Sequence, residues 1–216
     1  MLDATNSVDK KELTMITRIG LDHTEYLGNT IEAIALQKAG ILRKDTKALY
    51  FGDDADSARA IETAIHDIGA IGQSVDKKLW KDVKFRDKNI DFSYNSRYYD
   101  YIAITVSGIA TYQIENISMA LCALEMLLLG DEMPTVETIQ EVVKSTVWEG
   151  RMEEVLPDVF LDGAHNENGI CAFLESVKMT VANKKTLLFA VVSDKEYKAM
   201  IEHIVRSEVF DEIVIT

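Results

Sequence analysis

The C-terminal third of the chain alternates short β-rich runs with amphipathic helical segments, and this order constrains the fold more than any other feature. We expect strands at 155–162, 186–192 and 211–216, separated by helices at 167–181 and 195–207. Strands joined through helices of this length pair in parallel, because the helix carries the chain back across the sheet. The sequence therefore predicts an α/β fold with a doubly wound parallel sheet here. Three strands make a small sheet, so we expect this domain to be incomplete.

The N-terminal part shows the same alternation. We expect strands at 13–20 and 47–51 and helices at 30–38 and 57–68. The first helix has Asn29 as its expected N-cap, Glu32 in a capping box and Gly40 at its end. The second places Ile61, Ile65 and Ile68 on one face.

The middle of the chain has a different pattern. Residues 80–111 hold aromatic and β-branched runs interrupted by polar turn residues, which is typical of antiparallel hairpins. A long apolar helix is expected at 115–129 and a polar helix at 135–145. We place a domain boundary after them, which gives domains at 1–146 and 147–216.

Composition excludes several classes of protein. With 23 basic and 36 acidic side chains the net charge is −13, so nucleic acid and anionic membranes are poor main partners. The first residues contain no apolar segment typical of a signal peptide, and the apolar run at 117–129 is too short to span a bilayer. Cys122 and Cys171 have no CxxC neighbour and are expected to be buried free thiols. These features favour a cytoplasmic protein.

Two residues near the first expected helix are candidates for chemistry. His23 follows the first strand, at the kind of strand end where α/β sheets bind ligands, although a surface histidine is the commoner case. Lys38 shares the i, i+3, i+4, i+7 pattern of Ile31, Ile34 and Ala35, so its amine is expected on the apolar stripe. Burial would favour the neutral, nucleophilic amine. The alternative is a lysine whose head group reaches water at the helix end.

A second group of candidates lies near the domain boundary. Residues 162–166 read Asp-Gly-Ala-His-Asn between an expected strand and an expected helix. Small residues let the backbone approach a ligand there, and a helix N-terminus favours anions. A capped turn without a ligand is the alternative. Arg151, beside Trp148, is a candidate phosphate ligand or the partner of Glu153 or Glu154 in a surface ion pair.

Five segments in order resemble the folylpolyglutamate synthase/dihydrofolate synthase branch of the Mur ligase family. They are Leu-Asp-Ala-Thr-Asn at 2–6, Ile-Thr-Arg-Ile-Gly-Leu-Asp-His at 16–23 with Gln-Lys-Ala-Gly-Ile at 37–41, Tyr-Gln-Ile-Glu-Asn at 112–116, Trp-Glu-Gly-Arg at 148–151, and Asp-Gly-Ala-His-Asn at 162–166. The resemblance spans nearly the whole chain. It implies part of a Mur-ligase-like central ATPase domain at 1–146, followed by the start of a Rossmann-like C-terminal ligase domain at 147–216.

The resemblance also implies an activity, namely ATP-dependent amide ligation. The family phosphorylates a substrate carboxylate to an acyl phosphate, which the amine of L-glutamate then attacks. Substrates would be a folate, dihydropteroate or both, with ATP and Mg²⁺. Such chemistry needs metal ions on the phosphates and fixed dipoles where charge develops.

The family's functional residues map onto individual positions of this sequence. By resemblance, His23 is a magnesium ligand, and Lys38 is the carbamylated lysine that also holds metal. Asn116 contacts the adenine end of ATP, and Arg151 reaches the phosphates. Asp162 and His165 close over the nucleotide from the second domain. The resemblance also implies that Lys38 and His165 are catalytic residues. Asp3 lies in a segment that resembles the pterin or folate side of the site.

One departure from the family pattern affects function. No Gly-Lys-Ser/Thr phosphate loop occurs in the 216 residues, so γ-phosphate positioning has no scaffold. We therefore expect a fragment truncated at both ends and inactive alone. The alternatives are a non-catalytic truncated paralogue that binds a nucleotide or a protein partner, and a fragment of another Mur-type amino-acid ligase.

Overall fold

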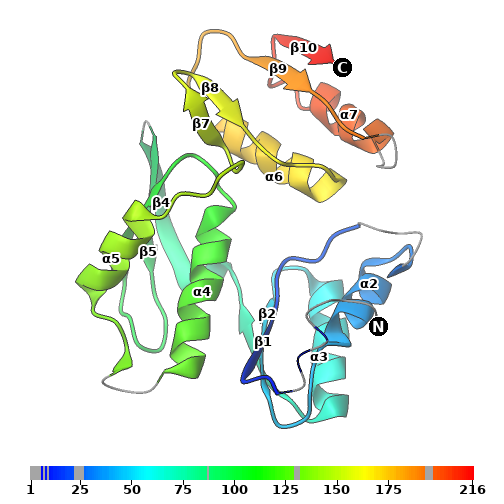
Figure 1. Ribbon diagram of the computed structural model, residues 1–216, viewed down its shortest axis with the longest axis vertical. Helices are drawn as coiled ribbons and strands as arrows, with labels where there is room; N and C mark the ends of the chain where they lie inside the picture. The colour runs from blue at the N-terminus through cyan, green and yellow to red at the C-terminus, as the bar shows by residue number, and fades with distance from the viewer. Residues whose placement is uncertain are drawn as a thin grey trace. The chain divides into compact units, whose positions relative to one another are not determined.

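The computed structural model describes residues 6, 8, 10–21, 27–86, 88–128, 132–192 and 197–216 (Figure 1). The chain forms two compact units. The first comprises Met1–Asp82, Ser93–Ala103 and Glu115–Ile139, and the second comprises Val83–Phe92, Ile104–Ile114 and Gln140–Thr216.

The first unit contains a three-stranded parallel sheet in the order β1-β2-β3. Its strands are β1 (Leu13–Ile16), β2 (Lys47–Phe51) and β3 (Ile71–Val75), and its helices are α2 (Ile31–Ala39) and α3 (Ala55–Ile68). Both helices cover the same sheet face, because Ala48 and Tyr50 of β2 pack in one core with Ala35 of α2 and Ile61 of α3. The expected β-α-β-α order is confirmed, while β3 was not expected.

Side-chain caps fix the ends of these helices. Thr30, and not Asn29, is the N-cap of α2, since its hydroxyl accepts a hydrogen bond from the Ala33 N–H at 3.2 Å. Asp54 caps α3 in the same way, through the Ser57 N–H at 2.7 Å. Gly69 ends α3 in the left-handed conformation with φ 75°, which glycine adopts without a steric cost.

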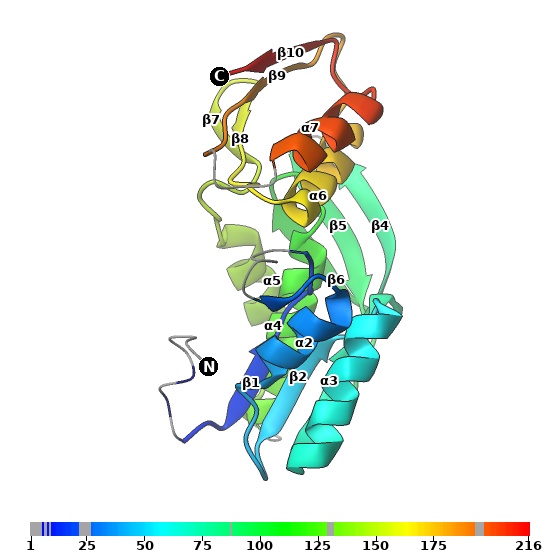
Figure 2. The same ribbon diagram turned by 90° about the vertical axis from the view of Figure 1, so that its right-hand side faces the viewer.

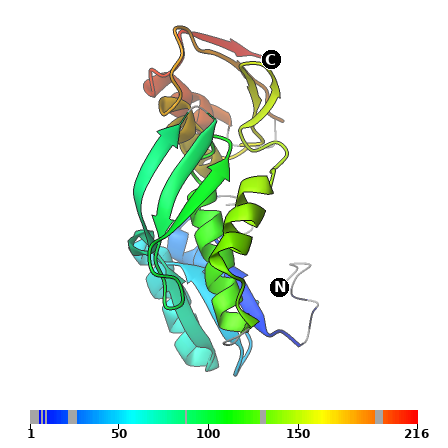
Figure 3. The same ribbon diagram turned by 90° about the vertical axis from the view of Figure 1, so that its left-hand side faces the viewer.

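The middle of the chain forms a second sheet, in the order β4-β5-β6 (Figure 3). Its strands are β4 (Trp80–Arg86), β5 (Asn89–Tyr94) and β6 (Ile102–Ser107), preceded by the short 3-10 helix η2 (Lys77–Leu79). The helices α4 (Gln113–Leu127) and α5 (Val136–Ser145) follow. Alternate residues of β5 are buried, as expected for a strand with one face on the core.

The C-terminal part of the second unit has two small sheets. The expected single strand at 155–162 is wrong, because β7 (Glu153–Leu156) and β8 (Val159–Leu161) form an antiparallel hairpin. Pro157 and Asp158 make its turn, in which Asp158 has φ 61°. The remaining elements are α6 (Glu167–Lys178), β9 (Thr186–Phe189), α7 (Tyr197–Arg206) and β10 (Glu212–Ile215).

The β9 and β10 strands pair in parallel, as the sequence predicts. The two helices α6 and α7 pack against them (Figure 2), and one apolar core joins Ile170, Leu174, Phe189, Met200 and Ile204. Among the described residues, none of the helices has the length and hydropathy needed to cross a bilayer.

One buried hydroxyl costs stability in the first sheet. Thr14 on β1 is 4% exposed, and its Oγ1 has no hydrogen-bond partner among the described residues. We expect Thr14→Val to raise the free energy of unfolding by about 1 kcal/mol, because it removes an unsatisfied polar atom and keeps the side-chain shape. Urea denaturation measures this change. Thr14→Ala, which also leaves a cavity, is the control and should be less stable than the valine variant. A valine variant less stable than the parent would contradict the assignment.

A buried carboxyl group ties α4 to the segment after β5. Glu125 on α4 is 8% exposed. Its Oε1 accepts hydrogen bonds from Ser96 Oγ and, at 3.5 Å, from Tyr94 Oη. Ser96 Oγ in turn accepts the N–H of Tyr99 at 3.2 Å. Burial raises the pKa of Glu125 above 4.5, although these donors and the charge of Arg97 oppose the shift.

This cluster makes stability depend on pH. The folded chain keeps the Glu125 proton to higher pH than the unfolded chain, so unfolding free energy falls as pH rises above 4.5 towards the raised pKa. The slope is at most about 1.4 kcal/mol per pH unit for one proton. We expect Glu125→Gln to be more stable than the parent at pH 8, with a difference that shrinks towards pH 4.5. Urea titrations across this range test it, with the exposed Glu141→Gln as control. Parallel profiles for parent and Glu125→Gln would refute it.

Candidate functional site

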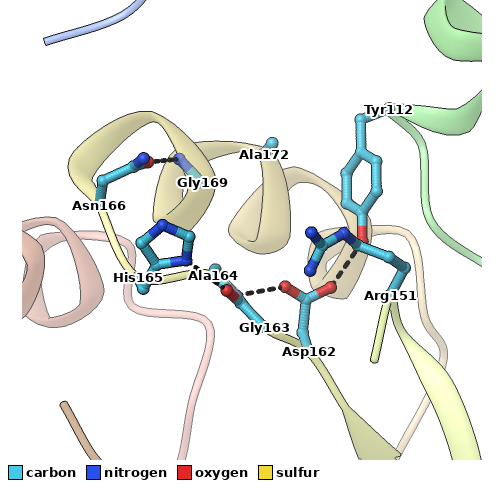
Figure 4. Close-up of a pocket in the computed structure, with 9 residues that line it drawn as sticks. All are labelled: Tyr112, Arg151, Asp162, Gly163, Ala164, His165, Asn166, Gly169 and Ala172. Atoms are coloured by element: carbon cyan, nitrogen blue, oxygen red, sulfur yellow. Dashed lines mark hydrogen bonds between the residues drawn. The ribbon is translucent and has the colours of Figure 1, made fainter. Parts of the chain in front are cut away.

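A cavity of about 230 Å³ lies in the second unit between the end of β8 and the start of α6 (Figure 4). Three separate chain segments contribute to it: the residue before α4, the turn before β7, and the loop from β8 to α6. The lining residues are Tyr112, Arg151, Asp162, Gly163, Ala164, His165, Asn166, Gly169 and Ala172.

The N-terminus of α6 forms one wall of this cavity. Asn166 is its N-cap, with Oδ1 accepting the Gly169 N–H at 2.8 Å. A Cβ at Gly169 would lie 3.1 Å from that oxygen, so glycine allows the cap to close tightly. The first turn of a helix presents backbone N–H groups and a partial positive charge, both of which favour an anion.

The Asp162 carboxylate joins all three segments. Its Oδ2 accepts hydrogen bonds from Tyr112 Oη at 2.6 Å and from the Met152 N–H at 2.9 Å. Its Oδ1 accepts the Ala164 N–H at 2.9 Å. Three donors occupy most of the acceptor capacity of one carboxylate. Asp162 therefore holds the three segments that line the pocket together through hydrogen bonds.

The turn that carries Arg151 has an unusual backbone. Gly150 has φ 63° and Met152 has φ 49°, so Arg151 lies between two residues in the left-handed region. The Gly163 N–H bonds to the Gly150 carbonyl at 2.8 Å, which ties this turn to the β8–α6 loop. A non-glycine residue in this conformation is strained, and such strain concentrates at functional sites.

The Arg151 guanidinium lies over Gly163. Its Nη1 donates to the Gly150 carbonyl at 3.2 Å and is 2.6 Å from where a Cβ at Gly163 would be. The ion pairs considered from sequence are not formed: Glu153 accepts the Gly150 N–H at 2.7 Å, and Glu154 pairs with Lys88. The exposed Arg151 guanidinium therefore lines the pocket instead of pairing with a neighbouring carboxylate.

The His165 ring has a defined orientation. Nδ1 lies 2.9 Å from the Gly163 carbonyl oxygen, which only accepts, so Nδ1 is the donor. In the neutral ring, Nε2 is then the acceptor. His165 can therefore accept a hydrogen bond or a proton from a bound molecule.

Tyr112 is half-buried between Asp162 and the core. Burial, followed by the hydrogen bond to Asp162 and the negative charge of that group, raises the pKa of the Tyr112 phenol. The phenol keeps its proton and remains a donor at neutral pH.

These features suit the pocket to a small anion. It offers one guanidinium and one helix N-terminus, with a histidine among the lining residues. Phosphate groups bind at sites of this composition.

Residues predicted from sequence divide into three groups. Arg151, Asp162 and His165 come together in the pocket. Lys38 and Asn116 belong to the first unit, and both are exposed. Asp3 and His23 lie outside the described residues, so their roles stay predictions.

Two of the motifs nevertheless meet within the first unit. Arg18, five residues before His23, donates from Nε to Glu115 Oε2 at 3.0 Å. The Arg18 guanidinium also lies 4.8 Å from the Phe51 ring centroid. Residues 16–21 are therefore tied through Arg18 to Glu115, the neighbour of Asn116.

Of the two alternatives for Lys38, the structure supports the exposed side chain. Ile34, Ala35 and Ala39 of α2 are buried, whereas Lys38 is exposed. Lys38 lies in the last turn, where a long side chain extends past the helix end and places its amine in water. Its metal-binding and catalytic roles, which the family resemblance suggests, remain predictions.

No group of three or more His, Cys, Asp or Glu side chains in the described part of the chain could hold a metal ion.

Sequence reasoning missed the roles of Tyr112 and Met152. Tyr112 is 50 residues from Asp162, and no local pattern signals their contact. The left-handed conformation of Met152 carries no sequence signal either, since methionine rarely adopts it.

Solved structures share this fold over about half their length. A folylpolyglutamate synthase (FPGS) complex with AMPPCP and folate matches 94% of this chain and 50% of that one, with a TM-score of 0.82 and 23% identity. E. coli FolC with DHPP and ADP matches 98% of this chain and 48% of that one, with a TM-score of 0.76 and 27% identity. The architecture is that of the Mur-type ligases.

Curated sequences define the family more narrowly. The dihydrofolate synthase/folylpolyglutamate synthase of Bacillus subtilis is 32% identical over 210 residues, which cover 94% of this chain and 48% of that protein. The folylpolyglutamate synthase of Lacticaseibacillus casei is 25% identical over 206 residues, with the same coverage. No family model matches the chain. The chain is homologous over nearly its whole length to dihydrofolate synthase/folylpolyglutamate synthases, and it spans about half the length of the curated relatives that it matches.

A methyl group at Gly163 tests the position of Arg151. We expect Gly163→Ala to weaken binding of inorganic pyrophosphate by about tenfold, since the new Cβ would displace the guanidinium and remove one charge-assisted contact. Isothermal titration calorimetry measures the affinity. In an Arg151→Ala background the same change should have almost no effect. Equal affinities of Gly163→Ala and the parent would show that Arg151 does not contact the anion.

Proposed function

We propose that this chain is the part of an ATP-dependent ligase that adds L-glutamate to a folate, to dihydropteroate, or to both, through an acyl phosphate. The observation that carries the proposal is the pocket in which Arg151, Asp162 and His165 meet at the α6 N-terminus. Relatives of this family are named for these activities. For the compartment, we propose the cytoplasm, where ATP is available.

Each part of the pocket has a role in this proposal. Arg151 and the α6 N-terminus bind nucleotide phosphates, and Asp162 holds both in register. His165 presents Nε2 to the bound molecule. Residues 1–146 contribute the C-terminal portion of the central ATP-binding domain, with Asn116 at the adenine. Residues 147–216 contribute the N-terminal portion of the Rossmann-like domain.

The remaining roles rest on the family resemblance. His23 and a carbamylated Lys38 would hold Mg²⁺, which neutralises phosphate charge when bound, and Asp3 would lie at the pterin. The exposed amine of Lys38 is accessible to carbon dioxide, which reacts with a neutral amine.

Binding and turnover of the chain test the proposal together. We expect ADP with Mg²⁺ to bind, and Arg151→Ala to weaken this binding by about tenfold or more, the effect of losing a charge-assisted contact. Because the 216 residues contain no Gly-Lys-Ser/Thr phosphate loop, we expect no folate- and glutamate-dependent ATP hydrolysis. Calorimetry measures the binding of ADP with Mg²⁺, and a phosphate-release assay measures ATP hydrolysis. Turnover above that of a mock purification would refute the second expectation, and no nucleotide binding would refute the first.

A chimera distinguishes a ligase part from a non-catalytic nucleotide-binding paralogue. The matched 210 residues of the Bacillus subtilis relative would be replaced by those of this chain. If the site residues are competent, the chimera should release phosphate only when folate and glutamate are both present. The same chimera with His165→Ala is the matched control. A chimera that unfolds cooperatively and binds ADP, yet has no turnover, would favour the paralogue.

A further inference from the structure

The Asp162 carboxylate is committed to contacts inside the protein. Two of its three donors are backbone N–H groups, from Met152 and Ala164, and the third is the Tyr112 phenol. The two backbone donors are set by their own segments. Of the three donors, only the Tyr112 hydroxyl can be removed by substituting a side chain.

The segment that carries Tyr112 is fixed by the core and by α6. The Thr111 N–H donates to Ser176 Oγ of α6 at 3.0 Å. Ile109 and Ala110 are buried in one cluster with Met152 and Val177, and Tyr112 packs against it. The phenol therefore approaches Asp162 from a rigid support.

The strained turn at Met152 needs that support. Met152 is 3% exposed and has φ 49°, a conformation that side chains rarely adopt. Burial holds its side chain, and Asp162 holds its N–H at 2.9 Å. Because Arg151 directly precedes it, the direction of the guanidinium depends on this turn.

We propose that Tyr112 is a positioning residue of the pocket: through Asp162, it holds the left-handed turn at Met152 and so directs Arg151 towards the bound anion. The proposal extends the function proposed above. Only the test by nucleotide binding depends on that function, whereas the test by hydrogen exchange does not. Tyr112 itself does not contact the ligand in this scheme, and its effect passes through Arg151.

Amide hydrogen exchange tests the positioning without any ligand. Tyr112→Phe removes only the hydroxyl, and we expect exchange at the Met152 and Ala164 N–H groups to become about tenfold faster. Tyr98→Phe, at an exposed tyrosine of the first unit, is the matched control and should leave both rates unchanged. Unchanged exchange at Met152 in Tyr112→Phe would overturn the proposal.

A double-mutant cycle tests the connection to Arg151. We expect Tyr112→Phe to weaken ADP–Mg²⁺ binding by about tenfold in the parent and by less than about twofold in an Arg151→Ala background. Equal losses in both backgrounds would overturn the proposal, because Tyr112 would then act independently of Arg151. Absence of nucleotide binding by the parent would instead contradict the proposed function, and the exchange experiment would still decide the role of Tyr112.

Discussion

The Asp162 carboxylate and its three hydrogen bonds hold the second unit's pocket together. They join the residue before α4, the turn before β7 and the loop before α6. Tyr112 is 50 residues from Asp162 in the sequence, and Met152 is 10 residues from it. A partly buried carboxylate needs donors, because burying it without them is costly. One carboxylate therefore links a side-chain donor and two backbone donors from three segments.

That arrangement resolves a conflict in the electrostatics of the chain. A net charge of −13 opposes binding of a nucleotide or any other anion. The pocket instead offers fixed local charges: the Arg151 guanidinium and the N–H groups at the α6 N-terminus. The nearest acid, Asp162, directs its oxygens to internal donors. Local dipoles at contact distance act more strongly than a diffuse field screened by salt.

Periodicity allowed most of the elements to be predicted. The strand at 47–51 and the helices at 30–38, 57–68 and 135–145 agree with the structure to within a few residues. The errors arose where one residue departs from the hydrophobic pattern of its neighbours. Pro157 and Asp158 divide an apolar run into a hairpin, and β3 reads Ile-Gly-Gln-Ser-Val, too polar to signal a strand. Lys38 shares the helical spacing of buried residues, but spacing does not show where a long side chain ends.

The sequence by itself determined the α/β class, the β9–α7–β10 parallel unit and the resemblance to folylpolyglutamate and dihydrofolate synthases, because hydrophobic spacing and five ordered motifs are local properties of the chain. It also identified Arg151, Asp162 and His165 as candidates. Only the tertiary structure decided that these three share one pocket, that Tyr112 and the strained Met152 support it, and that Lys38 is exposed. Contacts across 50 residues and the satisfaction of a partly buried charge depend on the folded backbone, and no local sequence pattern encodes them.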